Sequence, residues 1–216
     1  MLDLTFTDIL GRLLQGAIVT LTVSAGAWVV AVTLGLGFAL LTESRIPVVV
    51  PVTNFVTTCL RALPQLVILY VVFFGLGGIG ISLDPIVAAI VALGAMEGAF
   101  ASEVYRAGLL TVSTVQREAG LSLGLNNFQL FRLVIVPQMI PFLIAPLLNV
   151  FVGLTKTATI ASAVGVPEIL YDGQALMNET FQIVLISGMI VALYVMFTVP
   201  LTRLAARFEA RASFAH

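Results

Sequence analysis

The sequence predicts an all-α membrane protein that forms a single domain over residues 1–216. Sixty per cent of its 216 residues are hydrophobic and only 10% carry a charge. A water-soluble domain of this length needs more charged surface than that. The apolar residues also occur in long blocks rather than in short alternating runs, which indicates helices surrounded by lipid.

Five apolar blocks are long enough to cross a membrane, because about 20 helical residues span the hydrocarbon layer. The expected transmembrane helices cover residues 13–41, 47–74, 85–110, 136–154 and 181–204. An odd number of spans places the two ends of the chain on opposite sides of the membrane.

Basic residues predict the orientation, because cytoplasmic loops of membrane proteins are enriched in Arg and Lys. With the C-terminus inside, the cytoplasmic segments carry Arg45, Arg106, Arg117, Arg132, Arg203, Arg207 and Arg211. The outer segments then carry Asp3, Asp8, Asp84, Glu168, Asp172 and Glu179. Arg12, at the start of the first span, is the main exception. We therefore predict an N-out, C-in topology.

Two connecting segments are unusually long. Residues 111–135 mix leucines with polar side chains, which predicts one or two short amphipathic helices that break near Gly124 on the cytoplasmic side. A structured cytoplasmic segment in so small a membrane protein suggests a docking surface. The outer segment 155–180 is of similar length. It either folds back against the membrane, covers an entrance or forms an ordinary loop.

Composition argues against several classes of function. The formal net charge is −1, so no basic face for nucleic acid is expected. Cys59 is the only cysteine and His216 the only histidine, so neither a disulfide within the chain nor a metal site is expected. The N-terminus lacks a basic region followed by a cleavage site, so no signal peptide is expected.

The glycines at positions 75, 77 and 80 spell G-x-G-x-x-G, the pattern of a dinucleotide-binding turn. Here the pattern ends an apolar span and precedes Asp84-Pro85, whereas the dinucleotide motif joins a strand to a helix. A flexible outer turn is therefore favoured. The sequence also contains no G-x-x-x-x-G-K-[ST] motif, so P-loop binding of ATP by this chain is not expected.

A spaced pattern lies within and just after the polar segment 111–135. It reads Glu118-Ala119-Gly120, then Gly124, then Val134-Ile135-Val136-Pro137. It resembles the signature of ABC-importer permeases, which is Glu-Ala-Ala, three residues, Gly, nine residues, Ile, one residue, Leu-Pro. The spacing matches in full, and the departures are Gly for the second Ala, Val for Ile and Val for Leu. The resemblance implies that Glu118, Ala119, Gly120, Gly124, Val136 and Pro137 couple this chain to an ATPase.

Three further segments resemble the polar amino acid uptake subfamily, so that the resemblance covers nearly the whole chain. They run over residues 61–66 (Arg-Ala-Leu-Pro-Gln-Leu), 102–108 (Ser-Glu-Val-Tyr-Arg-Ala-Gly) and 154–160 (Leu-Thr-Lys-Thr-Ala-Thr-Ile). In the last segment Lys156 matches the subfamily, whereas Thr157 replaces its usual Asp.

The resemblance implies a multi-pass permease subunit in a bacterial inner membrane, importing amino acids or related small polar solutes. The subunit itself would be non-catalytic. ATP and magnesium would be bound by a separate ATP-binding cassette subunit, present in two copies. A second permease subunit, identical or homologous, would complete the pore, and a solute-binding protein would deliver the substrate from outside.

Polar residues inside predicted spans are candidates for a substrate path, because such residues are costly in lipid. The candidates are Arg61, Gln65, Glu97, Asn149 and Lys156. Alternatives remain open: Arg61 is a structural partner of Glu97, and Lys156 extends to the outer headgroups. For Glu103 the favoured partner is Arg106, three residues further on.

The sequence leaves other questions open. Gly94 and Gly98 form a G-x-x-x-G motif, which packs either within the subunit, as favoured, or between subunits. A secondary transporter or channel is the alternative function, although no internal repeat is visible. A membrane scaffold without a transport path is a third.

Overall fold

The computed structural model describes residues 5–44 and 46–213, with side chains up to residue 210, and every regular element in these ranges is helical. The predicted all-α class is confirmed. Asp3, Arg45, His216 and the side chain of Arg211, which entered the sequence predictions, lie outside the described parts.

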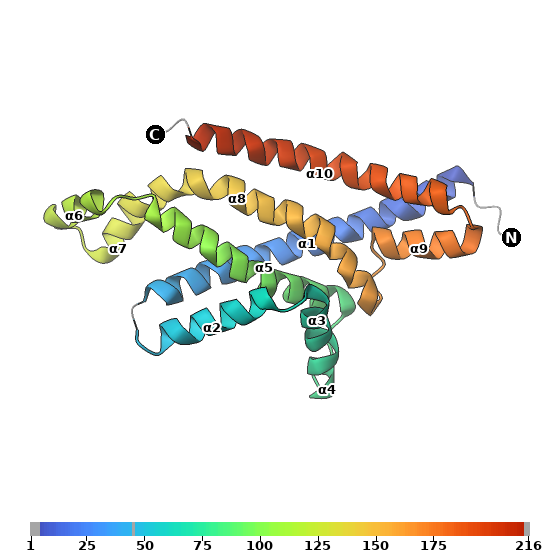
Figure 1. Ribbon diagram of the computed structural model, residues 1–216, viewed down its shortest axis with the longest axis horizontal. Coiled ribbons are helices and arrows are strands. Elements are labelled where there is room, and N and C mark those ends of the chain that lie inside the picture. Colours follow the sequence, from blue (N-terminus) through green and yellow to red (C-terminus); the bar gives the residue numbers. More distant parts are fainter. Residues whose placement is uncertain (1–4, 45, 214–216) are drawn as a thin grey trace.

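Long helices dominate the molecule (Figure 1). The first three are α1 (Phe6–Glu43), α5 (Pro85–Leu110) and α10 (Ile183–Ser213). A fourth continuous segment, Asn127–Val164, joins α7, η2, α8 and η3. These four are long and apolar enough to cross a membrane, and a bent helix pair brings the number to five among the described residues. The sequence predicted five spans, and the described residues form four, or five if the bent pair is counted as one span.

Helices α1 and α5 cross at very short distance. A Cβ atom added to Gly94 of α5 would lie 2.6 Å from Cβ of Val30, and one added to Gly35 of α1 would lie 2.7 Å from Cβ of Ala101. Such contacts are possible only without a side chain on the glycine. The G-x-x-x-G motif therefore packs within the subunit, as the favoured alternative predicted.

The second predicted span is not one helix, and the prediction of an uninterrupted span over 47–74 was wrong. Helix α2 (Val49–Ala62) ends at Leu63, which is extended with ψ of 144°. Pro64 then starts α3 (Gln65–Tyr70), which continues through the π-helical turn η1 (Val71–Gly75) into α4 (Leu76–Gly78). The two arms meet at 110°. The proline explains the break, because its ring forces the preceding residue out of helical geometry.

The fourth span begins nine residues earlier than the predicted start at Val136. Helix α7 (Asn127–Leu130) leads through the π-helical turn η2 (Phe131–Ile135) into α8 (Val136–Thr157), with no break in the helix. A capping box between Asn126 and Gln129 starts this helix among polar residues. Hydropathy marks where a helix enters lipid, not where it begins, so the sequence placed the start too late.

The segment 155–180 is almost entirely helical, so the ordinary-loop alternative is wrong. It contains the 3₁₀ helix η3 (Ala158–Val164) and α9 (Ile169–Thr180), and it packs on α1. Glu168 caps α9: its two carboxylate oxygens accept hydrogen bonds from the backbone N–H groups of Leu170 (2.9 Å) and Tyr171 (2.8 Å). Gly16 of α1 lies directly against this turn, which leaves no room for a side chain there.

Burial governs the charge of Glu168, which lies between the two spanning segments 127–164 and 183–210 and is fully inaccessible to solvent. Desolvation raises the pKa of Glu168 to about 7, and the negative charge of Asp172 adds to this rise. The two backbone N–H donors act in the opposite direction, since they favour the carboxylate.

Replacement of Glu168 by Gln is expected to weaken the pH dependence of stability. Because the pKa of Glu168 is raised in the folded protein, that state binds its proton more tightly than the unfolded chain, and stability falls as pH rises through about 7. As pH rises, the melting temperature of the wild type should therefore fall relative to that of Glu168→Gln. Thermal unfolding of the purified protein between about pH 5 and about pH 8.5 measures this.

Glu209→Gln, on the exposed face of α10, is the matched control and should track the wild type at every pH. If Glu168→Gln also tracks the wild type, Glu168 does not titrate in this range.

Candidate coupling and translocation sites

Two short helices form a projection at the end of the molecule where α10 finishes (Figure 1). They are α6 (Thr114–Ser122) and α7, capped by the side chains of Ser113 and Asn126 respectively. Gly124 lies in the turn between them with φ of +81°, a conformation that favours glycine. The sequence predicted one or two short helices with a break near Gly124, and the structure has two, with the turn at that glycine.

Gly120 holds the two helices of this projection together. It is buried, and a Cβ atom at this position would lie 2.5 Å from Cδ1 of Leu130 on α7. The signature that this segment resembles has alanine here. In this chain the side chain of Leu130 fills the space of the missing methyl group, which explains the departure in physical terms.

The surface of the projection carries large apolar side chains among its polar ones. Four large side chains are exposed on it: Val115, Leu121, Leu123 and Phe128, with Leu123 83% exposed. Glu118 and Ala119 are also exposed. Exposed apolar side chains beside a charge, on a rigid turn, are typical of a protein-docking surface.

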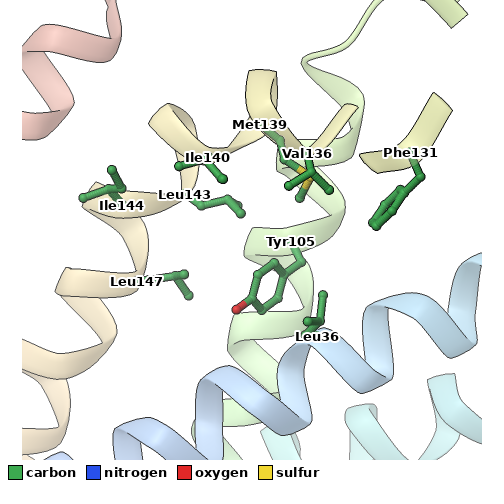
Figure 2. Close-up of a pocket in the computed structure, with 9 residues that line it drawn as sticks. All are labelled: Leu36, Tyr105, Phe131, Val136, Met139, Ile140, Leu143, Ile144 and Leu147. Carbon is green, nitrogen blue, oxygen red and sulfur yellow. The ribbon is translucent and has the colours of Figure 1, made fainter. Parts of the chain in front are cut away.

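The remaining two residues of the spaced pattern lie elsewhere. Val136 and Pro137 begin α8, after the π-helical turn η2. Pro137 is exposed, whereas Val136 is half-buried and faces an apolar cavity between α1, α5 and α8 (Figure 2). The pattern therefore divides into an exposed part on α6 and its turn and a second part at the start of a spanning helix.

Arg61 is paired with Glu103 rather than with Glu97. Its Nη1 lies 3.1 Å from Oε1 of Glu103, and the other oxygen of that carboxylate lies 3.2 Å from Nη1 of Arg106. The Glu103–Arg106 pair was predicted and is confirmed, and the Arg61–Glu97 pair is wrong. The second span bends just after Arg61, which brings the end of α2 to the level of Glu103. The resulting charge cluster ties α2 to α5.

The other four path candidates make no hydrogen bond or ion pair through their side chains within the described chain. Glu97 is half-buried in α5, and Gln65 is half-buried at the first position of α3. Asn149 and Lys156 are exposed on α8. Charged and amide groups in spanning helices are costly unless a partner or water satisfies them. These side chains are therefore available to a ligand or to a second subunit.

Sequence reasoning missed two features. One is the buried cap of Glu168, whose only sequence signal was an acidic residue before a helical pattern. The other is the apolar cavity of Figure 2, to which Leu36, Tyr105 and Leu143 contribute from three different helices. No sequence pattern marks it, because its walls come together only through helix packing.

Comparisons with known proteins agree on one family. Residues 31–214 match the family described as "Binding-protein-dependent transport system inner membrane component". The "Probable amino-acid permease protein YxeN" of Bacillus subtilis is 33% identical over 165 residues, which cover 75% of this chain and 74% of that protein. The "Histidine/lysine/arginine/ornithine transport system permease protein HisQ" of Escherichia coli is 29% identical, and the match covers 87% of each chain.

A solved structure is similar over nearly the whole chain. The structure titled "Crystal structure of an amino acid ABC transporter with histidines" matches with a TM-score of 0.86 and 28% identity, covering 97% of this chain and all of that chain. A MetNI methionine ABC transporter shares the fold, with a TM-score of 0.79 at 19% identity, covering 97% and 99% of the two chains. This chain belongs to the family of inner membrane components of binding-protein-dependent transport systems.

Proposed function

We propose that this chain is the permease subunit of an ATP-driven importer for amino acids or related small polar solutes. The exposed projection of α6 and α7 is the observation that carries the proposal, because large apolar side chains exposed beyond the spanning helices are typical of a surface that binds another protein. Relatives named as amino-acid permeases support the solute class. The orientation is N-out, C-in, so that the projection lies in the cytoplasm.

The partner at the projection is an ATP-binding cassette subunit, which holds ATP and magnesium. Two copies act on two permease subunits, identical or homologous, and a solute-binding protein delivers substrate on the opposite side. This chain performs no covalent step in the scheme. Its role is to convert movement of the ATPase into movement of the spanning helices.

The continuous segment Asn127–Val164 supplies the mechanical link. Helix α7 belongs to the projection, and the same helix runs on through α8 to η3 at the far end of the bundle. At about 1.5 Å per residue its 38 residues are about 57 Å long, more than the thickness of the hydrocarbon layer. A displacement of α7 is therefore passed to the outer end along one continuous helical segment. The π-helical turn η2 is the one irregular position near the docking end.

The substrate path runs between α5 and α8. A Cβ atom on Gly108 of α5 would lie 2.7 Å from Cδ2 of Leu143, which sets the register of these two helices. The two helices are antiparallel. Position 97, eleven residues before Gly108, therefore lies at the same level along the bundle as position 154, eleven residues after Leu143. Glu97 is thus about level with the stretch between Asn149 and Lys156.

This placement suggests how a zwitterionic solute is bound. Lys156 accepts the carboxylate of the solute, and Glu97 binds an ammonium or guanidinium group. Asn149 and Gln65 supply neutral hydrogen bonds. The Arg61–Glu103–Arg106 cluster lies about 9 Å along α5 from Glu97 and is already paired, so its role is to hold α2 against α5.

Gly124→Asp is expected to abolish association with the ATPase. An aspartate at φ of +81° strains the turn and places a charge in the apolar docking surface. Co-purification of the ATPase with tagged permease should fall by about tenfold or more, while the permease still enters the membrane.

Glu118→Gln should leave the complex assembled but reduce transport per ATP hydrolysed.

Gly77→Asp, at a position in α4 with free space for a side chain, is the control and should retain the ATPase. Transport that continues without ATP and without an ATPase partner would instead support the secondary-transporter alternative.

Glu97→Gln is expected to weaken uptake of solutes that carry an extra positive charge. The variant keeps the size of the side chain but removes a charge-assisted hydrogen bond worth about 1.5–3 kcal/mol, which corresponds to roughly a 10- to 100-fold change in affinity. Uptake of labelled basic and neutral amino acids into vesicles containing the whole complex measures the effect.

Glu209→Gln serves as the control for removal of a carboxylate, and ATPase co-purification checks that the Glu97 variant assembles. Equal affinity for basic amino acids in the wild type and Glu97→Gln would remove Glu97 from the substrate path.

A further inference from the structure

The cavity of Figure 2 lies on the membrane-embedded surface near the coupling projection. It measures about 340 Å³ and is lined by nine side chains: Leu36, Tyr105, Phe131, Val136, Met139, Ile140, Leu143, Ile144 and Leu147. Tyr105 is the only polar one among them, and its hydroxyl group donates a hydrogen bond to the carbonyl oxygen of Val32 at 3.2 Å. The cavity thus offers no free polar group, and an apolar cavity of this kind does not retain water.

The dimensions of this cavity match half of a lipid bilayer. Its α8 wall runs from Val136 to Leu147, eleven residues or about 16 Å along the helix axis. The hydrocarbon layer is about 30 Å thick, so one leaflet accounts for about 15 Å. The wall is also open to the surroundings, since Ile140 is 48% exposed and Leu36 is 39% exposed. An acyl chain of one leaflet therefore fits along it.

A second cavity of about 370 Å³ adjoins the first on the side of α6 and α7. The two share Phe131, and Leu40, which lines the second, lies one helical turn from Leu36. The second cavity is lined mainly by apolar side chains, but Arg117, Asn127 and Glu43 give it the polar groups that the first cavity lacks. Polar groups therefore lie beyond one end of the apolar cavity, in the order of a lipid headgroup and its chain.

The charge of the second cavity favours an anionic headgroup. Nη2 of Arg117 donates to the carbonyl oxygen of Leu109 at 2.6 Å, whereas its Nε is buried and has no hydrogen-bond partner. A buried guanidinium donor without a partner is unfavourable, and a phosphate oxygen would satisfy it. Arg132, next to the shared Phe131, is exposed and unpaired. Glu43 is exposed, so its carboxylate can point into water.

We propose that the two cavities together form a binding site for one anionic phospholipid, with an acyl chain along α8 and the phosphate at Arg117. Val136 belongs to both the cavity wall and the coupling pattern, and the π-helical turn η2 contributes Phe131 to both cavities. A lipid here thus supports the joint between the projection and the spanning helix. The site is independent of the solute and of the substrate path.

Native mass spectrometry of the permease co-purified with its ATPase tests this proposal. The complex is exchanged into nanodiscs of phosphatidylcholine with or without phosphatidylglycerol, then released into detergent. Wild type should retain one phosphatidylglycerol per permease subunit in preference to phosphatidylcholine. Ile140→Trp, which fills the apolar cavity, and Arg117→Gln, which removes the cation, should each lower retention by about tenfold.

Val191→Trp and Arg203→Gln, both exposed on α10, are the matched controls and should retain lipid as the wild type does. Equal retention in all variants, equal retention of phosphatidylcholine, or loss of the bound lipid whenever the ATPase is present would overturn the proposal. Loss of the ATPase with the lipid still bound would count against the proposed function and not against this site.

Discussion

The contact between α1 and α5 is the constraint on which the rest of the structure depends. In lipid no hydrophobic force drives one helix against another, so close packing of small side chains must do it. Gly35, Gly94 and Gly98 let the two backbones approach until a single methyl group would collide with the facing helix. Once this pair is formed, α2, α8 and α9 all pack on one or both of its members.

Irregular backbone occurs at several positions of this scaffold, and three of them lie next to a contact or joint between elements. The break at Pro64 is joined to α5 by the ion pair of Arg61 with Glu103. The turn before α9 is closed by the buried carboxylate of Glu168. The π-helical turn η2 lies between the coupling projection and α8. All three lie where the proposed mechanism needs a joint or a firm attachment.

Predictions from the sequence succeeded where the cause is local. The pair Glu103–Arg106 follows from spacing along one helix, and the turn at Gly124 follows from the freedom of glycine. They failed where a partner comes from another helix, as for Arg61, whose choice between Glu97 and Glu103 depends on the bend at Pro64. The start of the fourth span was missed because hydropathy follows the lipid boundary rather than the helix.

Composition, spacing and motif by themselves determined that the chain is helical, that it spans a membrane and that it belongs with transport permeases. These properties depend on individual residues and their near neighbours in the sequence, because hydropathy and helix periodicity are local. Only the tertiary structure decided which charges pair, how segment 155–180 folds onto α1, and that two cavities meet at Phe131. Such features arise from the register between helices, and a shift of one residue turns a side chain by about 100°.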